Sequence, residues 1–273
     1  SGYPEFVESV FSTVIFKWIS TPIAVFVSFI PFSLTEISLY ASLPILIILI
    51  VKFIRKLKKS ENRVKYTLLK LKIVGWTLSV LYLAFMLLLG LNYTRMPLSQ
   101  TMNIPVERRS KEDLHSVCLI LVEQLNIARE NVAEDENGVM IPGSSISNIL
   151  KTGYLGFWEV NDEYEILRIP KLRAKGVLAS RYWSYTGIVG MYFPFFVEAN
   201  VNTDVVNAYI PSTVLHELAH LIGVAREDEA EFVSFITGIN HPDPDFIYSA
   251  YLSAYHHAAN ALFREDREMH ANV

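Results

Sequence analysis

Disulfide frameworks are excluded first, because the 273 residues contain a single cysteine, Cys118. The sequence also lacks internal repeats and low-complexity tracts. Lys and Arg number 24 against 28 Asp and Glu, giving a net charge of −4. Basic residues gather in one short stretch only, so we expect no nucleic-acid binding.

Apolar residues are abundant, at 51% of the chain, and they are concentrated in residues 1–95. The chain opens with "SGYPEF", which has no initiator Met, no basic region and no small-residue cleavage site. This start is therefore not a signal peptide as written, and the loss of an upstream segment or a tag stays open.

Two long apolar runs predict transmembrane helices over residues 34–54 and 73–92. Each is long enough to cross a hydrocarbon core of about 30 Å at a rise of about 1.5 Å per residue. Residues 52–72 between them contain nine basic residues and one acid, Glu61. The positive-inside rule places this basic loop in the cytoplasm, and the chain after the second run outside it.

The first apolar segment, residues 5–31, contains Glu8 and Lys17 and is interrupted by Pro22. We predict that it lies at the outer membrane surface or re-enters the bilayer, with a third membrane span as the alternative. The chain then divides into a membrane region, 1–95, and an extracytoplasmic domain, 96–273.

Local patterns predict the elements of this domain. Ser110 and Asp113 form a capping-box pattern before a helix that the sequence "EDENG", residues 134–138, is expected to end. A short helix is predicted near residues 144–150, and a strand or paired extended segment over 186–202. Helical periodicity returns after Pro211 and continues to the tail.

The stretch "TVLHELAHLIGVAREDEAEF", residues 213–232, carries the chemistry. His216 and His220 are four residues apart, so on a helix they share one face and can bind one zinc ion. Glu217 lies beside them, where it can take a proton from a water that zinc acidifies towards a pKa of about 7. The alternative is an ordinary helix with surface histidines.

The acids that follow extend this prediction. Gly223 is a natural helix stop, and a short connection would turn the chain into a second, antiparallel helix. Glu227 would then lie beside His220 as the third ligand, and Glu231 beside His216 as a carboxylate orienting its ring. Glu229 would point the opposite way. Three protein ligands leave one coordination position open, as in catalytic zinc sites. The alternative is a solvated acidic helix start that the helix dipole favours.

The HELAH motif followed by E-x-x-A-E resembles the gluzincin metallopeptidases, whose pattern is HExxH followed by E-x-x-[A/S]-[D/N/E]. The blocks "LNYTRMPL", "GIVGMYFPFFVEANVN", "TVLHELAHLIGVAREDEAEF" and "YSAYLSAY" resemble the bacterial membrane family of domain of unknown function 3810, over roughly residues 4–262. The resemblance implies a mainly α fold: transmembrane helices, then an α+β gluzincin-like zincin domain with a small sheet edge and an active-site helix pair. Glu231 departs from the Asn that is common at this position of the family.

The resemblance also implies further site residues. An edge strand near the active helix would pair with substrate, and Ala199–Asn202 is the candidate, with Glu198 and Asn200 facing substrate or fixing the site. A buried structural network is the equal alternative. An oxyanion donor would come from the last helix, where Tyr251, Tyr255 and His256 are candidates. Tyr251 and Tyr255 also fit a core stripe.

The sequence therefore predicts a multi-pass membrane zinc metallopeptidase that binds one Zn²⁺ per chain and cleaves extracytoplasmic or membrane-proximal peptides. Its expected partners are a peptide or protein substrate and the lipid bilayer. Two alternatives stay open: a catalytically inactive zincin-fold scaffold in an envelope complex, and a zinc amidohydrolase acting on a non-peptide bond.

Overall fold

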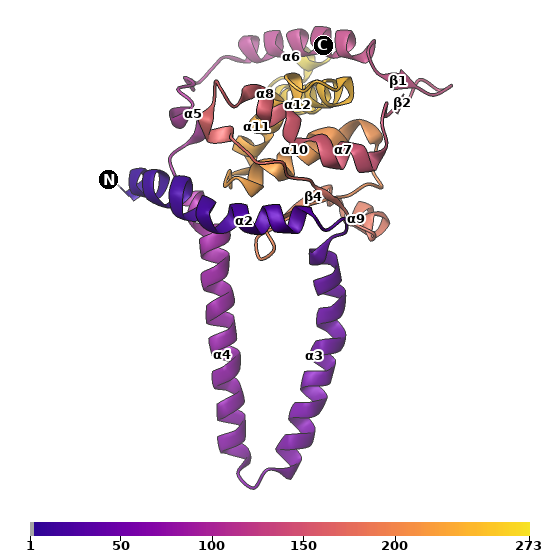
Figure 1. The fold of residues 1–273 in the computed structure, drawn as a ribbon. Coiled ribbons are helices and arrows are strands. Elements are labelled where there is room, and N and C mark those ends of the chain that lie inside the picture. Colours follow the sequence, from indigo (N-terminus) through magenta and orange to yellow (C-terminus); the bar gives the residue numbers. More distant parts are fainter. Residues whose placement is uncertain (1–2) are drawn as a thin grey trace.

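The computed structural model describes residues 3–273 and has two visible parts, a long helical hairpin and a helix-rich domain above it (Figure 1). The hairpin consists of α3, Leu34–Lys59, and α4, Arg63–Leu88. Each helix begins at a side-chain cap, since Ser33 accepts from the backbone of Glu36 and Asn62 from that of Lys65. Both helices are long and apolar enough to cross a membrane.

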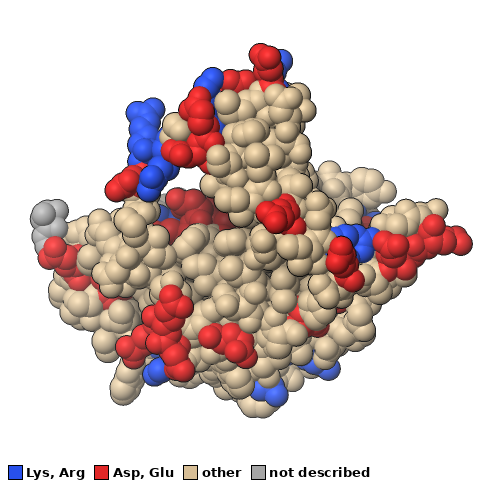
Figure 2. Space-filling view, turned by 90° about the horizontal axis from the view of Figure 1, so that it is seen from above, with Lys and Arg blue, Asp and Glu red and all other residues tan. Residues whose placement is uncertain are grey.

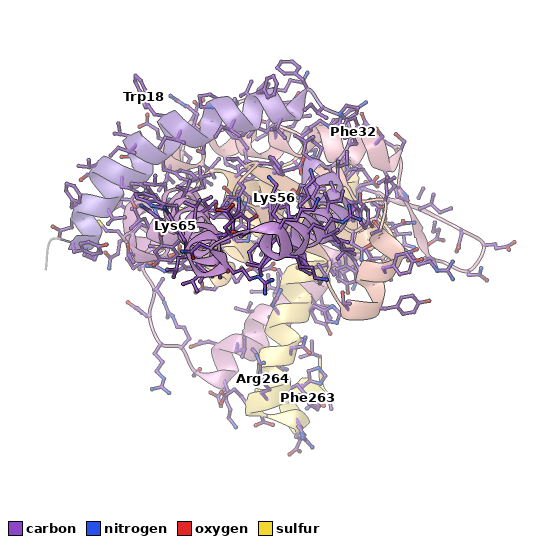
Figure 3. The ribbon with its side chains drawn as sticks, turned by 90° about the horizontal axis from the view of Figure 1, so that it is seen from below. Trp18, Phe32, Lys56, Lys65, Phe263 and Arg264 are labelled. Atoms are coloured by element: carbon purple, nitrogen blue, oxygen red, sulfur yellow. The ribbon has the colours of Figure 1, made fainter. Side chains whose placement is uncertain are left out.

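The basic segment 52–72 is not the loop that the sequence analysis predicted. Helix α3 continues to Lys59 and α4 begins at Arg63, so only residues 60–62 connect them. Lys, Arg and Leu are good helix formers. The charged side chains therefore allow the helix to continue from an apolar environment into water without interrupting it. The basic residues therefore extend both helices past the apolar runs. Lys56 and Lys65 lie towards the end of the hairpin that is remote from the domain, which points towards the viewer in Figure 3.

The N-terminal segment is one continuous helix of three parts: α1, Tyr3–Phe6; η1, Val7–Phe16, with wider π-helical turns; and α2, Lys17–Ser28. It is also long and apolar enough to span a membrane. However, it runs across the upper ends of α3 and α4 and does not lie alongside them (Figure 1). Phe16 and Ala24 are buried in contact with the rest of the chain. The surface position and the third span both stay predictions for residues 5–31.

Hydrogen bonds to buried charged groups join both ends of the helical hairpin to the domain. The carboxylate of Glu198 accepts from the backbone N–H groups of Leu34 and Thr35 at the start of α3, and it pairs with Lys175 at 3.1 Å. At the other end, α4 leads into η2, Gly90–Thr94, and then to Arg95, whose guanidinium pairs with Glu8 and donates to the carbonyl of Gly223. Both membrane-side helices are therefore held at fixed positions under the domain.

A three-stranded sheet forms the lower wall of the domain. Its strands are β3, Lys175–Gly176; β4, Gly190–Phe193; and β5, Glu198–Val201. Their order is β3-β5-β4, with β5 parallel to β3 and antiparallel to β4. The extended segment predicted over residues 186–202 is thus the hairpin β4–β5. A second sheet pairs β1, Ala133–Glu134, with β2, Met140–Ile141.

The helix predicted from Ser110 is α6, Lys111–Arg129, and its capping box is present. It ends at Arg129, before "EDENG"; Glu134 of that stretch belongs to β1, and residues 135–138 lie in the turn of the β1–β2 hairpin. The predicted short helix is α7, Ile146–Thr152, capped by Ser145. The smaller elements of the domain are α5, Leu98–Thr101; α8, Tyr154–Val160; η3, Glu165–Leu167; α9, Ser180–Thr186; η4, Asn207–Tyr209; and α13, Arg267–His270.

Three C-terminal helices complete the domain: α10, Ile210–Leu221; α11, Glu227–Ile239; and α12, Pro244–Glu265. Helix α10 is buried on most of its surface and supplies Val214, Leu215 and Leu218 to the main core. On the face remote from the hairpin, acidic and basic side chains lie mainly towards the rim (Figure 2). The motif-bearing helix is therefore central and rigidly packed, as a precise site requires.

Candidate metal centre

The HELAH motif lies in the second half of α10, and α11 folds back beside it. Gly223 has a φ of 91° and ends the first helix, and five residues, 222–226, connect the two. Glu227 is the first residue of α11, and Glu231 lies one turn later. Because the helices are antiparallel, Glu231 reaches the earlier histidine, as predicted.

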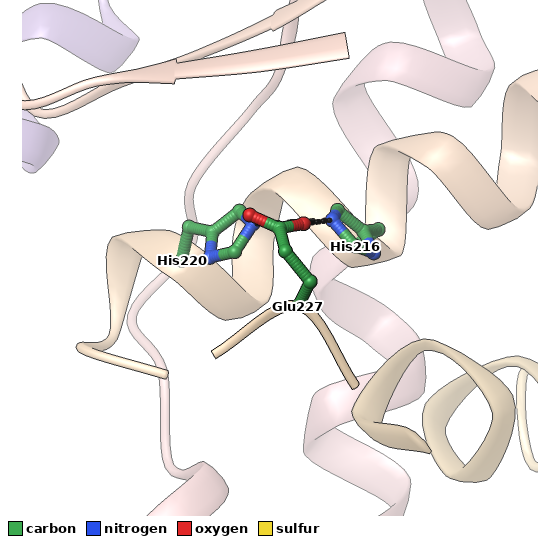
Figure 4. A group of neighbouring side chains, drawn as sticks. All are labelled: His216, His220 and Glu227. Atoms are coloured by element: carbon green, nitrogen blue, oxygen red, sulfur yellow. Dashed lines mark hydrogen bonds and ion pairs between the residues drawn. The ribbon is translucent and has the colours of Figure 1, made fainter. Parts of the chain in front are cut away.

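The donor atoms of His216, His220 and Glu227 converge on one point (Figure 4). Nε2 of His216 lies 3.1 Å from Oε2 of Glu227 and 3.1 Å from Nε2 of His220, and the third separation is 3.6 Å. Tetrahedral zinc with bonds of about 2.0–2.1 Å would separate its ligand atoms by about 3.3 Å. The three side chains therefore fit the predicted ligand set, while zinc binding itself stays a prediction.

The opposite ring nitrogens of the two histidines face acceptors. Nδ1 of His220 lies 2.7 Å from the carbonyl oxygen of Val224, so this ring donates there and leaves the lone pair of Nε2 free. Nδ1 of His216 lies 3.1 Å from Oε1 of Glu231, but the N–H is not aligned well enough for a hydrogen bond. Acceptors at both rings are the arrangement that orients metal-binding imidazoles.

Of the three glutamates of α11, Glu227 and Glu231 face the histidines and Glu229 does not. The imidazoles of His220 and His216 hold the pKa of Glu227 at about 2, so this carboxylate is ionised at neutral pH. Burial acts to lower the pKa of His216, but the carboxylates of Glu231 and Glu227 outweigh it and the pKa is raised. Glu229 points away, as predicted, and accepts from Leu98 and Arg226.

Glu217 is the most unusual carboxyl group of the site. It is 4% exposed, its Oε2 has no hydrogen-bond partner among the described residues, and burial raises its pKa to about 8. It fits against Gly190 of β4, where a Cβ atom would come within 2.2 Å of Oε1. Only glycine leaves room for this side chain, and the sequence gives no signal of that contact.

These side chains line a cleft of about 620 Å³. One wall is formed by Val189 and by Gly190 and Tyr192 of β4. Leu89 and Tyr93, which follow α4, close the side nearest the hairpin. Helix α12 supplies the opposite wall. The cleft therefore extends from the metal centre to the end of a candidate transmembrane helix.

The strand that borders the cleft is β4, which corrects the prediction of Ala199–Asn202. Strand β5 lies between β3 and β4, so both of its edges are already paired, and its four residues are buried. Because Asn202 N donates to Val189 O, alternation leaves the backbone groups of Gly190 and Tyr192 facing away from β5. The strand order, a non-local property, decides which strand is free.

Glu198, Asn200 and Asn202 do not line the cleft. Glu198 and Asn200 bond to Ser33 and Thr35 at the start of α3, and Asn202 bonds to Ser184 and Ile188. The buried structural network, which the sequence left as an equal alternative, is what the structure contains.

Of the three oxyanion candidates, only His256 lines the cleft. Its Nδ1 lies 2.6 Å from the hydroxyl of Tyr209, and the two rings are stacked. Tyr251 instead packs edge-on against Phe235, and neither Tyr251 nor Tyr255 lines the cleft; both are half-buried. Sequence analysis missed Tyr209, which is the last residue of η4 and directly precedes α10.

One family model matches the chain, described as "Protein of unknown function (DUF3810)", over residues 11–273. No curated protein and no solved structure matches it.

Proposed function

The chain belongs to the DUF3810 family, and we propose that it is a membrane-anchored zinc metallopeptidase that cleaves extracytoplasmic, membrane-proximal polypeptides. The observation that carries the proposal is the convergence of three metal-ligand atoms from His216, His220 and Glu227 within 4.8 Å of one another. The open cleft beside them gives a substrate access to the same point.

The donor set supports zinc over the other common divalent ions. Two imidazoles and one carboxylate are typical of catalytic zinc, whereas Mg²⁺ and Ca²⁺ prefer oxygen ligands alone. Zinc bound there would supply Lewis-acid chemistry, which acidifies water and polarises a carbonyl oxygen. The acceptors at both Nδ1 atoms would keep the two rings oriented for it.

Glu217 is the proposed general base. Its buried carboxylate faces the cleft with one oxygen unpartnered, so it is placed to accept a proton from an attacking water. The same carboxyl would then return the proton to the leaving nitrogen. Burial raises the pKa of this carboxyl, and a cation bound beside it would lower that pKa.

The Tyr209–His256 pair is the proposed donor to the developing oxyanion. One hydrogen is used in the contact between the Tyr209 hydroxyl and Nδ1 of His256, so the neutral pair has one further hydrogen to donate, from either the hydroxyl or Nε2. Both side chains lie in the cleft, and the 2.6 Å contact between them orients the hydroxyl and the ring together. A donor already in position when charge develops lowers the barrier without reorganisation. The free backbone groups of Gly190 and Tyr192 would pair with an extended substrate.

The decisive test substitutes Glu217→Gln in the full chain in lipid nanodiscs. We expect about one zinc per chain to be retained and hydrolysis of a peptide library to fall by about 10²-fold or more, since the proton acceptor is lost. Asp228→Asn is the matched control, because it neutralises an exposed carboxylate in the same turn as Glu227 and should change neither quantity.

Equal hydrolysis by wild type and Glu217→Gln would reject the mechanism. Absence of stoichiometric zinc from the wild type would instead favour the inactive scaffold. Zinc-dependent cleavage of non-peptide amides, with no cleavage of peptides, would favour the amidohydrolase.

A further inference from the structure

The short helix α9 carries an unusual exposed apolar surface. Leu178, just before it, is 90% exposed, and Tyr182 and Tyr185 are 73% and 78% exposed. Soluble domains expose single apolar residues commonly, but a contiguous group of this kind marks an interaction site. The contacts of this surface within the chain do not explain it.

The first turn of α3 holds the start of α9 in place through hydrogen bonds. The carboxylate of Glu36 accepts from the backbone N–H groups of Leu178 and Ala179, each at 2.7 Å. Glu36 is the last charged residue before the apolar run of α3, which continues from residue 37 to residue 51. Helix α9 therefore begins where α3 would enter the hydrocarbon core.

Other exposed aromatic residues lie on the same side of the domain. Phe29 and Phe32, in the connection between α2 and α3, are 81% and 48% exposed. Figure 3 shows Phe32 at the edge of the domain when it is seen from the hairpin side. The connection that leads into the candidate transmembrane helix therefore also exposes aromatic side chains, and Glu36 joins the first turn of that helix to the start of α9.

We infer that Leu178 and α9 insert into the outer interfacial layer of the lipid bilayer, beside α3. Tyrosine is enriched in this layer because its ring prefers the apolar side and its hydroxyl the headgroups. Leu178 would reach the acyl boundary, as apolar residues of interfacial helices do. The inference requires that α3 crosses the membrane, and it is independent of any peptidase activity.

This contact would also set the height of the cleft above the bilayer. Ser184 of α9 donates to the carbonyl of Asp204 and accepts from Asn202, which follows β5 directly. Residues 187–189 then lead from α9 into β4, the strand that borders the cleft. Lipid contact at α9 would therefore hold the substrate-facing strand close to the membrane surface.

Spin-label accessibility in nanodiscs of the full chain tests the inference. A label at Leu178→Cys should be several-fold more accessible to oxygen, relative to a water-soluble nickel complex, than a label at Val139→Cys. Val139 is the matched control, because it is apolar and 51% exposed but precedes β2, far from the hairpin in Figure 1. Leu46→Cys, within α3, gives the value for the bilayer interior. Wild type reports any background from the buried Cys118.

An equal ratio at positions 178 and 139 would overturn the inference, because it would place α9 in water. Protection of position 178 from both reagents would also overturn it, since the surface would then be covered by protein. Leu178 is almost fully exposed, so the substitution should leave folding intact, and a thermal melt equal to that of wild type checks this.

Discussion

The contact between Gly190 and Glu217 gives the most demanding prediction, which concerns Gly190→Ala. A methyl group at this position would lie 2.2 Å from Oε1, 2.8 Å from Cδ and 2.9 Å from Cγ of Glu217. Ordinary contacts between such atoms are about 3.5–4.0 Å, so the carboxylate and the strand must separate by about 1 Å or more. Glu217 is 4% exposed but lines the cleft, so we expect its carboxylate to be displaced from β4 towards the cleft.

The displacement should affect catalysis more than metal binding. A general base misplaced by about 1 Å costs about 10²-fold in rate, and inserting a methyl group into a packed site costs about 1–3 kcal/mol of stability. We therefore expect kcat/KM for a cleaved peptide to fall by about two orders of magnitude, with zinc content unchanged. Elemental analysis and steady-state kinetics on the same preparation measure both.

Gly143→Ala is the matched control, since its methyl group would meet only Asp245, at 3.7 Å. It should retain wild-type kinetics. Full activity in Gly190→Ala with normal zinc content would refute the placement of Glu217 against β4 as a requirement for catalysis.

Three other predictions follow from the same contacts. Glu231→Ala should weaken zinc affinity by about 10–100-fold, because His216 loses the carboxylate at its Nδ1. Competition with a chelator measures the affinity. An unchanged affinity would show that Glu231 does not support the zinc ligands. Burial acts to raise the pKa of Glu198, but hydrogen bonds from Thr35 and Leu34 and the charge of Lys175 outweigh burial and lower the pKa below the ordinary 4.5. The stabilisation that the ionised Glu198 gives to the fold is therefore fully present above pH 4.5. It is lost as the pH falls towards the pKa of the folded state. The Tm of wild type should therefore drop in this acid range more steeply than that of Glu198→Gln, and parallel curves would contradict the assignment. Finally, because Leu89 and Tyr93 line the cleft, substrates tethered to a transmembrane anchor by short spacers should be cleaved faster than the same peptides free in solution, and rates independent of tethering would argue against membrane-proximal cleavage.

The sequence alone was sufficient for features that depend on local periodicity. The spacing of His216 and His220, the stop at Gly223 and the position of Glu227 fix a helical hairpin through geometry that spans fewer than twenty residues. Composition likewise identified the apolar runs of α3 and α4, because hydrophobic length is a property of a segment by itself. The capping box at Ser110 was predictable for the same reason.

Tertiary structure decided everything that depends on which segments meet. The strand order β3-β5-β4 made β4 the free edge and buried Ala199–Asn202. The pairing of Tyr209 with His256 joins residues 47 positions apart, and the fit of Gly190 against Glu217 joins a strand to a helix. No period in the sequence encodes such contacts, because packing between distant elements selects them. The ligands of the candidate metal centre can thus be predicted from spacing within one short segment. The cleft around them depends on contacts between segments that are distant in the sequence.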